Sequence, residues 1–432
     1  MSYFTWKEIS KHNSPEDCWV VIDGSVYDVT GWVGSHPGGD ILTSLSGEDI
    51  SALFHSYHVK DITSRLEACK IGRVAKFRSV YDDINDSFLK TLKARVSDYF
   101  TDKEINYRET PKNKICIILT AILFFTSWSL TYLYYHSLPL TAVLMGLCTC
   151  SLIGSFGHEI IHANLFAHTG KKKTLYKLLN DILWGVFIPF MPERFFQYEH
   201  LKHHMYPMNP EYDYDVFALR HLIRLSPQQE IKKYHSMQHI YAPFVYGIYL
   251  FVQILGGYTS SFFSSRNLLK DKGVFRSVII SSFTAFAIHV AIPMYLTGIW
   301  WMLLCNAVYF FTWQSMIYVT SGVPHMTGVV NNANANASGS WAYYVCSSTC
   351  NIKCGNKFVD WVTGGLNYHL VHHLLPAIPR EYFPDISHIV ESTCQEFGYP
   401  YRMYTSFFSY YKDHFEFLYH LGHTSTAYQV AE

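Results

Sequence analysis

Three clusters of histidines carry the strongest chemical signal in this sequence. Within each cluster, imidazoles stand three or four positions apart, a spacing that brings side chains to one face of a helix. Imidazole is a good ligand for iron and zinc, and eight imidazoles could hold two metal ions with about four ligands each. The candidate ligands are His158 and His162 in the first cluster, His200, His203 and His204 in the second, and His369, His372 and His373 in the third.

A second set of histidines lies near the amino terminus. His36 begins the tight turn His-Pro-Gly-Gly, which presents an imidazole beside backbone of little bulk. His58 follows after Phe54, and His55 is an alternative close by. Two neutral imidazoles that face each other across a flat apolar slot can hold a haem iron from both sides. Such an iron has no open position, so it would transfer electrons and would not bind oxygen.

Two long stretches without Asp, Glu, Lys or Arg indicate the elements that position the three clusters. They run over residues 115–156 and 277–351. A membrane span needs about 20 apolar residues, so each stretch has room for a hairpin of two spans. The expected spans are about 115–135, 139–156, 277–296 and 300–320.

The lysines and arginines beside these hairpins predict the orientation of the chain. They flank the spans at Lys112 and Lys114, at residues 171–173 and near Lys272 and Arg276, whereas both hairpin turns lack them. By the positive-inside rule the flanks face the cytosol. The three histidine clusters then share the cytosolic membrane face, together with both termini.

The sequence before the spans indicates two further units, a small domain and a linker. Residues 1–76 contain short strand-like runs joined by the turn Asp23-Gly24, typical of a small α+β domain. Residues 77–111 have the pattern of a linker helix, and residues 112–432 hold the spans and clusters. The predicted fold is therefore multi-domain: a small α+β domain, then an all-α integral membrane domain with two hairpins and a cytosolic helical cap.

Composition agrees with this organisation and excludes other classes. The 432 residues carry 34 Lys+Arg and 34 Asp+Glu, for a net charge of +0, which excludes a general nucleic-acid binder. Charged residues make up only 16%, below the roughly 25% of soluble domains, so disorder and charged coiled coils are excluded as well.

The amino-terminal 76 residues resemble the cytochrome b5 family. The matching features are the run from Asp17 to Gly24, the His-Pro-Gly-Gly turn, and the Gly-Glu-Asp that precedes a second histidine. The resemblance implies haem b with His36 and His58 as axial ligands. His58 is preferred to His55 because Phe54 and Tyr57 stand where the family places aromatics before its second ligand.

The remainder resembles the membrane-bound fatty acid desaturases, and the fused cytochrome b5 points to the front-end desaturases. These enzymes carry HxxxH, HxxHH and HxxHH or QxxHH boxes around a di-iron centre. Further matches are the run from Pro210 to Asp215, the run from Gly365 to Tyr368, and the run from Leu374 to Arg380. The resemblance implies that all eight box histidines bind two non-haem irons, and that His325 after the fourth span is a ninth ligand.

The resemblance also implies an activity and its partners. The expected reaction is O2-dependent desaturation of a fatty acyl chain, carried as acyl-CoA or as acyl-lipid. The fused haem would supply the electrons, and a separate NADH-cytochrome b5 reductase would recharge it, because no Gly-x-Gly-x-x-Gly fingerprint occurs here. The expected location is the endoplasmic reticulum membrane, in contact with membrane lipid.

Two departures from the front-end pattern bear on where the double bond falls. The third box begins with His369, where front-end members usually have Gln, and the first box reads His-Glu-Ile-Ile-His, where they usually have Asp and Gly inside. His at the first position of the third box is usual in other desaturases, so His369 keeps the expected metal chemistry. The position of the new double bond stays open.

Other functions use parts of the same pattern. His158-Glu159-x-x-His162 equals the zinc metalloprotease motif, but a protease would leave the other clusters and the haem domain unexplained. A haem electron carrier with a membrane anchor would need one span only. Sphingolipid desaturases and lipid hydroxylases share the boxes and the oxidant, so they remain alternatives within the same chemistry.

Overall fold

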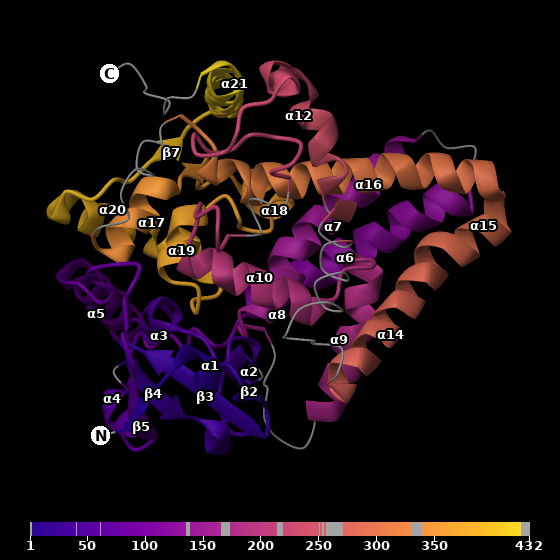
Figure 1. Cartoon of the computed structure of the whole chain (residues 1–432). Helices are drawn as coiled ribbons and strands as arrows, with labels where there is room; N and C mark the ends of the chain where they lie inside the picture. Colours follow the sequence, from indigo (N-terminus) through magenta and orange to yellow (C-terminus); the bar gives the residue numbers. More distant parts are fainter. Residues whose placement is uncertain are drawn as a thin grey trace.

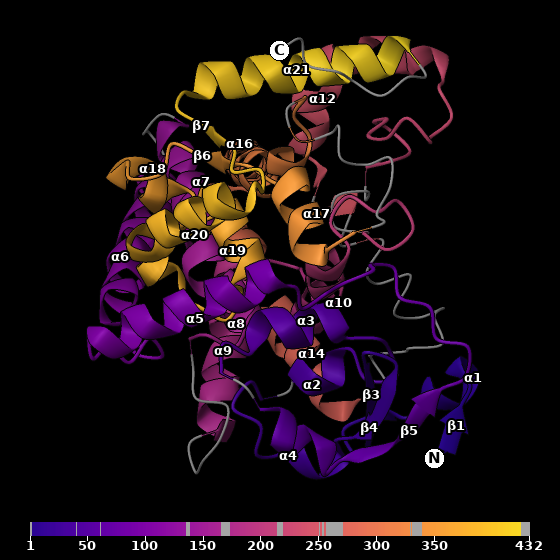
Figure 2. The ribbon, with the colours of Figure 1, turned by 90° about the vertical axis from the view of Figure 1, so that its left-hand side faces the viewer.

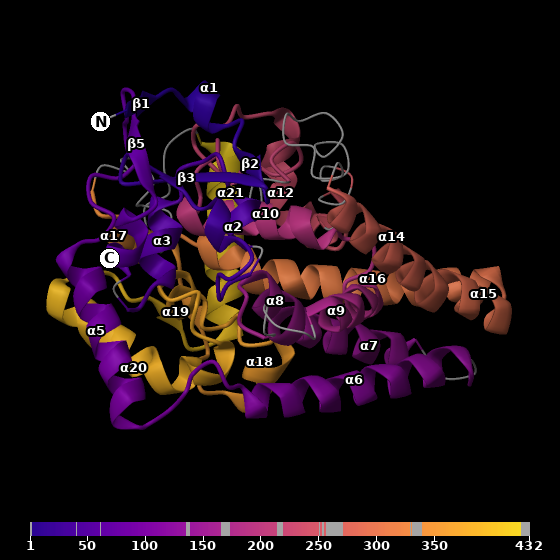
Figure 3. The same cartoon turned by 90° about the horizontal axis from the view of Figure 1, so that it is seen from below.

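The structure is a computed structural model with a small α+β part, a set of long helices and a helical cap over one end of them (Figure 1). It describes residues 2–39, 41–60, 62–134, 139–165, 173–213, 219–249, 251–252, 255, 271–328, 330 and 339–424. The α+β part is drawn in indigo, and the long helices extend away from it (Figure 3).

The amino-terminal part is built on a five-stranded sheet in the order β1-β5-β4-β3-β2, in which only β1 and β5 pair in parallel. The expected hairpin is present: Asp23 and Gly24 have φ of 49° and 72°, as the central residues of a type I′ turn require. The strands are β1 (Ser2–Phe4), β2 (Asn13–Ser14), β3 (Asp17–Ile22), β4 (Ser25–Asp28) and β5 (Lys70–Val74). The helices are α1 (Trp6–Ile9), η1 (Thr30–Trp32), α2 (Ile41–Ser44), α3 (Ser51–Tyr57) and α4 (Thr63–Glu67).

Four helices in the described part of the chain are long and apolar enough to cross a membrane, in two consecutive pairs as expected. The first two spans are α6 (Pro111–Tyr132), and α7 (Leu140–Leu152) continued by η2 (Ile153–His158) and α8 (Glu159–Ile161). The other two are α14 (Lys272–Phe286) continued by η5 (Ala287–Ala291) and α15 (Ile292–Thr297), and α16 (Ile299–Ser321) continued by η6 (Val323–His325). The turn expected at residues 136–138 lies outside the described residues, and the second hairpin turns at Gly298, with φ of 78°.

The second span is the central one. Of its most apolar segment, 72% is buried inside the protein, against 28% for the corresponding segment of α6 and 22% for that of the third span. It packs between α6 and α16 (Figure 3). The outer helices leave apolar side chains such as Ile118, Leu119 and Phe283 exposed, as lipid-facing helices do.

The remaining elements form the cap and its supports. They are α5 (Ser87–Asp102), α9 (Lys173–Phe187), α10 (Glu193–Met205), η3 (Lys233–Met237), α12 (Gln238–Tyr246), α17 (Trp341–Ser348), β6 (Asn351–Ile352), α18 (Lys357–Val362), α19 (His369–Leu374), η8 (Arg380–Tyr382), α20 (Phe383–Phe397), β7 (Met403–Tyr404) and α21 (Phe407–His423). The short strands β6 and β7 pair in parallel. Helix α5, which carries Phe88, Leu92 and Val96 on its buried face, packs against α20 (Figure 2).

One apolar cluster joins the amino-terminal part to the helical cap. Leu45, which follows α2, and Ala52 and Leu53 of α3 share this cluster with Leu201 and Met205 of α10. Burial of apolar surface is the main favourable term in association, so this shared core fixes the α+β part against the helices that carry the histidines. The fold class expected from the sequence is confirmed.

Candidate metal and haem centres

The second span carries the first histidine box at its carboxyl-terminal end. A π-helical turn, η2, extends the span to His158 and leads into the short helix α8, after which His162 follows. Gly154 in this turn lies against the loop before the third box, because a Cβ there would be 2.6 Å from the carbonyl oxygen of Thr363. Only glycine permits this approach, which brings the first box beside the third.

The structure gathers all nine expected metal ligands into two neighbouring buried groups. Within each group, the candidate ligand atoms lie within 4.8 Å of one another. The first group is His158, His162, His200, His204 and His372, and the second is His203, His325, His369 and His373. The groups adjoin, since the rings of His204 and His373 stack with centroids 4.3 Å apart. The arrangement can therefore hold two metal ions side by side.

The separations between imidazole nitrogens fit metal ligation in the first group. The Nε2 atom of His200 lies 3.0 Å from that of His158 and 3.1 Å from that of His204, and the Nε2 atoms of His204 and His372 are 2.8 Å apart. An ion about 2.1 Å from two nitrogens holds them about 3.0 Å apart at a right angle and about 3.4 Å apart in a tetrahedron. The separations in this group are therefore short enough for several of these nitrogens to bind one ion.

The second group has the same geometry. The Nε2 atom of His369 lies 3.0 Å from that of His325 and 3.2 Å from that of His373. His369, which stands where front-end members usually have Gln, thus lies inside the second group, and its imidazole contacts those of His325 and His373.

Burial keeps these imidazoles neutral, as ligation requires. Desolvation lowers the pKa of His162, His204, His369, His372 and His373 well below the ordinary value, and the neighbouring imidazoles lower it further. In addition, the buried Nε2 atom of His162 has no hydrogen-bond partner within the described structure. A buried polar atom of this kind is expected where an ion completes its bonding.

Hydrogen bonds from outside the groups orient individual rings. The Nδ1 atom of His203 lies 2.9 Å from Oδ2 of buried Asp213, and that oxygen also accepts the backbone N–H of Met208 at 2.7 Å. The Nδ1 atom of His325 lies 2.7 Å from the carbonyl oxygen of Ser348. Such partners fix which ring nitrogen carries the proton and leave Nε2 directed at the metal. Asp213 belongs to the run from Pro210 to Asp215, but no local spacing in the sequence predicts its contact with His203.

The geometry does not favour the protease alternative. His158 and His162 share their group with three imidazoles from the other two boxes. Oε1 of Glu159 accepts the backbone N–H of Arg380 at 3.2 Å, a contact outside the two groups.

The amino-terminal part places His36 and His58 beside each other. Their ring centroids are 6.3 Å apart, with an angle of 64° between the planes. Two metal–nitrogen bonds of about 2 Å, with about 1.1 Å from each nitrogen to its ring centre, give about 6 Å, so one iron fits between the rings. The Nδ1 atom of His58 lies 2.8 Å from the carbonyl oxygen of Phe54, which leaves Nε2 for the iron. His55 is turned away, because its Nε2 atom lies 2.8 Å from Oδ2 of Asp23.

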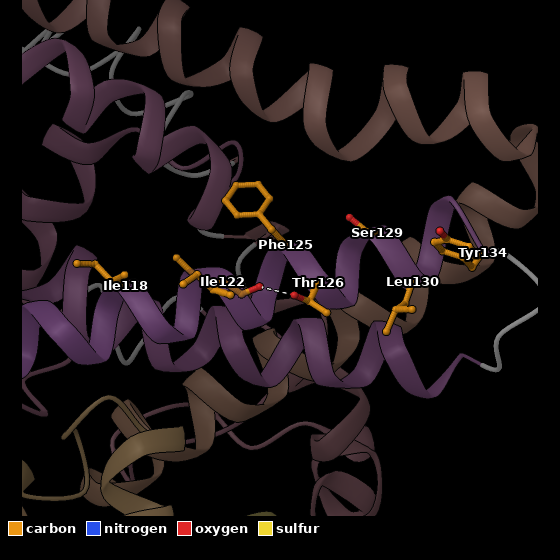
Figure 4. Close-up of a pocket in the computed structure, with 8 residues that line it drawn as sticks. Ile118, Ile122, Phe125, Thr126, Ser129, Leu130 and Tyr134 are labelled. Carbon is orange, nitrogen blue, oxygen red and sulfur yellow. Dashed lines mark hydrogen bonds between the residues drawn. The ribbon is translucent and has the colours of Figure 1, made fainter.

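A hollow elsewhere on the molecule belongs to the lipid-facing surface. It is an open groove lined by Ile118, Ala121, Ile122, Phe125, Thr126, Ser129, Leu130 and Tyr134, all on or just after α6 (Figure 4). Its walls are mostly apolar and include no histidine, so it is separate from both centres.

Comparison with known proteins agrees with both centres. Residues 118–405 match the family described as fatty acid desaturase, and residues 5–75 match the cytochrome b5-like heme/steroid binding domain. The Delta(5) fatty acid desaturase A of Dictyostelium discoideum is 26% identical, over 97% of this chain and 94% of that protein. The acyl-lipid (8-3)-desaturase of Physcomitrium patens is 27% identical, over 98% of this chain and 92% of that protein. The Delta(8)-fatty-acid desaturase of Helianthus annuus is 24% identical, over 92% of this chain and 87% of that protein.

Proposed function

Since this chain belongs to the fatty acid desaturase family and carries an amino-terminal cytochrome b5-like haem domain, we propose that it is a front-end desaturase. It would insert a double bond on the carboxyl side of one already present in a fatty acyl chain. The relatives named Delta(5) and Delta(8) desaturases support this, because they align over nearly the whole chain. The name of the Physcomitrium relative favours an acyl-lipid as the carrier over acyl-CoA.

The observation that carries the proposal is the convergence of nine buried imidazoles into two groups at the ends of the spans. In the proposed assignment, the group with His158 holds one iron, the group with His203 holds the other, and His36 and His58 hold the haem. When both irons are bound, they supply the oxidant that removes two hydrogens from adjacent carbons with O2. Burial lowers the pKa of His162, His204, His369, His372 and His373 and so keeps them neutral. Asp213 accepts a hydrogen bond from Nδ1–H of His203, so that Nε2 can ligate.

The division of the chain and its setting belong to the same proposal. Residues 1–76 form the haem domain, residues 77–111 the linker, and residues 112–432 the membrane domain. Both termini and the metal groups face the cytosol by the positive-inside rule, and the membrane is that of the endoplasmic reticulum. An NADH-cytochrome b5 reductase supplies electrons to the haem.

Expression in a host that lacks polyunsaturated fatty acids tests the proposed reaction. Defined unsaturated fatty acids are fed, and the position of any new double bond is located by mass spectrometry in the acyl-CoA and phospholipid fractions. We expect a product with the new bond between the carboxyl group and the existing bond, first in phospholipid, and no product from His372→Ala. Hydroxylated products, or desaturation confined to sphingolipid bases, would refute the proposal in favour of the alternatives that share these boxes.

A further inference from the structure

Among the described residues, Tyr57 of the haem domain contacts a candidate metal ligand. Tyr57, the last residue of α3, directs its hydroxyl group to the Nδ1 atom of His162, and these two atoms are hydrogen-bonded. The two rings lie with centroids 6.0 Å apart and an angle of 31° between their planes. Tyr57 is also the residue immediately before His58, which faces His36 in the haem slot. One residue thus adjoins both centres.

The surrounding interface holds this contact in place. Helix α3 lies against α10, the helix of the second box (Figure 2). Glu48 accepts a hydrogen bond from the hydroxyl group of Tyr198 at 2.9 Å and forms an ion pair with Lys202 at 3.2 Å. Ser44 donates a hydrogen bond of 2.6 Å to Oε1 of Gln197. With the shared apolar cluster, these contacts from α10 dock the haem domain in a single orientation.

The contact lies on the outer side of a candidate ligand. His162 belongs to the first metal group and its buried Nε2 atom has no hydrogen-bond partner within the described structure, so Nε2 is the candidate ligand atom and Nδ1–H donates a hydrogen bond to the oxygen of Tyr57. The route from His58 to His162 is therefore one peptide unit, the tyrosine side chain and one hydrogen bond.

We propose that Tyr57 is the electron-transfer contact between the haem and the iron pair, an inference that rests on the ligand assignment proposed above. One electron leaves the reduced haem, which becomes ferric, and the iron pair gains that electron through the tyrosine and His162. In this proposal the tyrosine is a bridge and is itself neither oxidised nor deprotonated. Each double bond requires two such transfers, and an NADH-dependent flavoprotein reductase recharges the haem between them.

Flash photoreduction of the full-length holoprotein tests this role without any fatty acyl substrate. A flash-excited ruthenium polypyridyl complex donates one electron to the haem under anaerobic conditions, with the iron pair oxidised at the start. The reoxidation of the haem is then followed by its absorption. Tyr57→Phe keeps the ring and removes the hydroxyl group. Tyr198→Phe is the matched control, because it removes a phenolic hydroxyl from the same interface but not from a contact with His162.

We expect haem reoxidation in Tyr57→Phe, measured on protein prepared with excess iron, to slow severalfold, because the hydrogen bond that joins the tyrosine to His162 is lost. The rate in Tyr198→Phe, the haem spectrum and the iron content per haem should match those of the unmodified protein. An unchanged rate in Tyr57→Phe would overturn the inference, as would equal slowing in Tyr198→Phe, which would indicate docking. Loss of iron in Tyr57→Phe would overturn it too, by showing that the residue only supports the metal group. An unmodified protein whose haem stays reduced would instead refute the proposed function.

Discussion

Removing the carboxylate of Asp213 should loosen the iron held by the group that contains His203. The side chains of both residues are almost fully buried, with 2% of His203 and none of Asp213 exposed. Oδ2 of Asp213 accepts two hydrogen bonds, one of 2.9 Å from Nδ1 of His203 and one of 2.7 Å from the backbone N–H of Met208. Asp213→Ala removes both at once.

The expected size of the effect follows from these two bonds. Loss of the partner of a ligating imidazole lowers metal affinity by about 10- to 100-fold, which is about 1.4 to 2.8 kcal/mol. The backbone N–H of Met208 would be left buried without its acceptor, which costs about 1 to 3 kcal/mol of folding stability. Asp213→Asn keeps an oxygen acceptor and loses the charge, so its effect on both quantities should be smaller.

Chelator challenge of the purified holoprotein measures the affinity. Iron remaining per haem is determined at graded chelator concentrations, and the haem serves as the internal reference. Asp17→Ala is the control, since it breaks another histidine–carboxylate contact, the 2.7 Å pair with His12 on the surface of the haem domain. If Asp213→Ala releases iron at the same chelator concentration as the unmodified protein, the carboxylate does not orient His203 and the reasoning fails.

Four further predictions address the haem, the packing, the charge state and the topology. His58→Ala should abolish the absorption spectrum of a haem with two imidazole ligands and His55→Ala should retain it; the opposite result would exchange their roles. Gly154→Ala should lower the thermal unfolding midpoint, because its Cβ would lie 2.6 Å from a backbone carbonyl oxygen, whereas Gly31→Ala, whose Cβ meets no described atom within 4 Å, should not. Because burial lowers the pKa of the clustered imidazoles, the unfolded chain binds protons below about pH 6.5 that the folded chain excludes. Stability should therefore be greatest well above that pH and fall progressively as the pH decreases below it; a constant unfolding midpoint would contradict this. A glycosylation acceptor inserted beside Gly298 should be modified in microsomes and one at the amino terminus should not, and the reverse pattern would refute the proposed orientation.

Local features of the sequence were enough to predict the fold class and the chemistry. Spans could be predicted because two stretches without charges exceed the length that a bilayer requires, and four apolar helices confirm them. The hairpin at Asp23 and Gly24 could be predicted because a type I′ turn has a short signature. The resemblance to desaturases with a fused cytochrome b5 domain is likewise confirmed by the family matches.

The sequence placed the ends of the spans less well. The helix of the first span begins at Pro111, before the uncharged stretch. Lys112 and Lys114 lie within its first turn, so the absence of charge marks its start too late. The second continues through η2 as far as Ile161, so that His158 is part of the span itself. Hydropathy marks the apolar core of a helix, whereas backbone hydrogen bonds carry the helix on into its polar ends.

By itself, the sequence determined which residues could bind metal and on which helices they stand. Only the tertiary structure decided how they are shared between the two groups, for His203 and His204 belong to different groups, as do His372 and His373. Successive side chains on a helix point about 100° apart, so neighbours in one box face different ions. Their partners come from other helices, as does Tyr57, which meets His162 across 105 positions of sequence. Contacts of this kind depend on how whole elements pack, which no local spacing encodes.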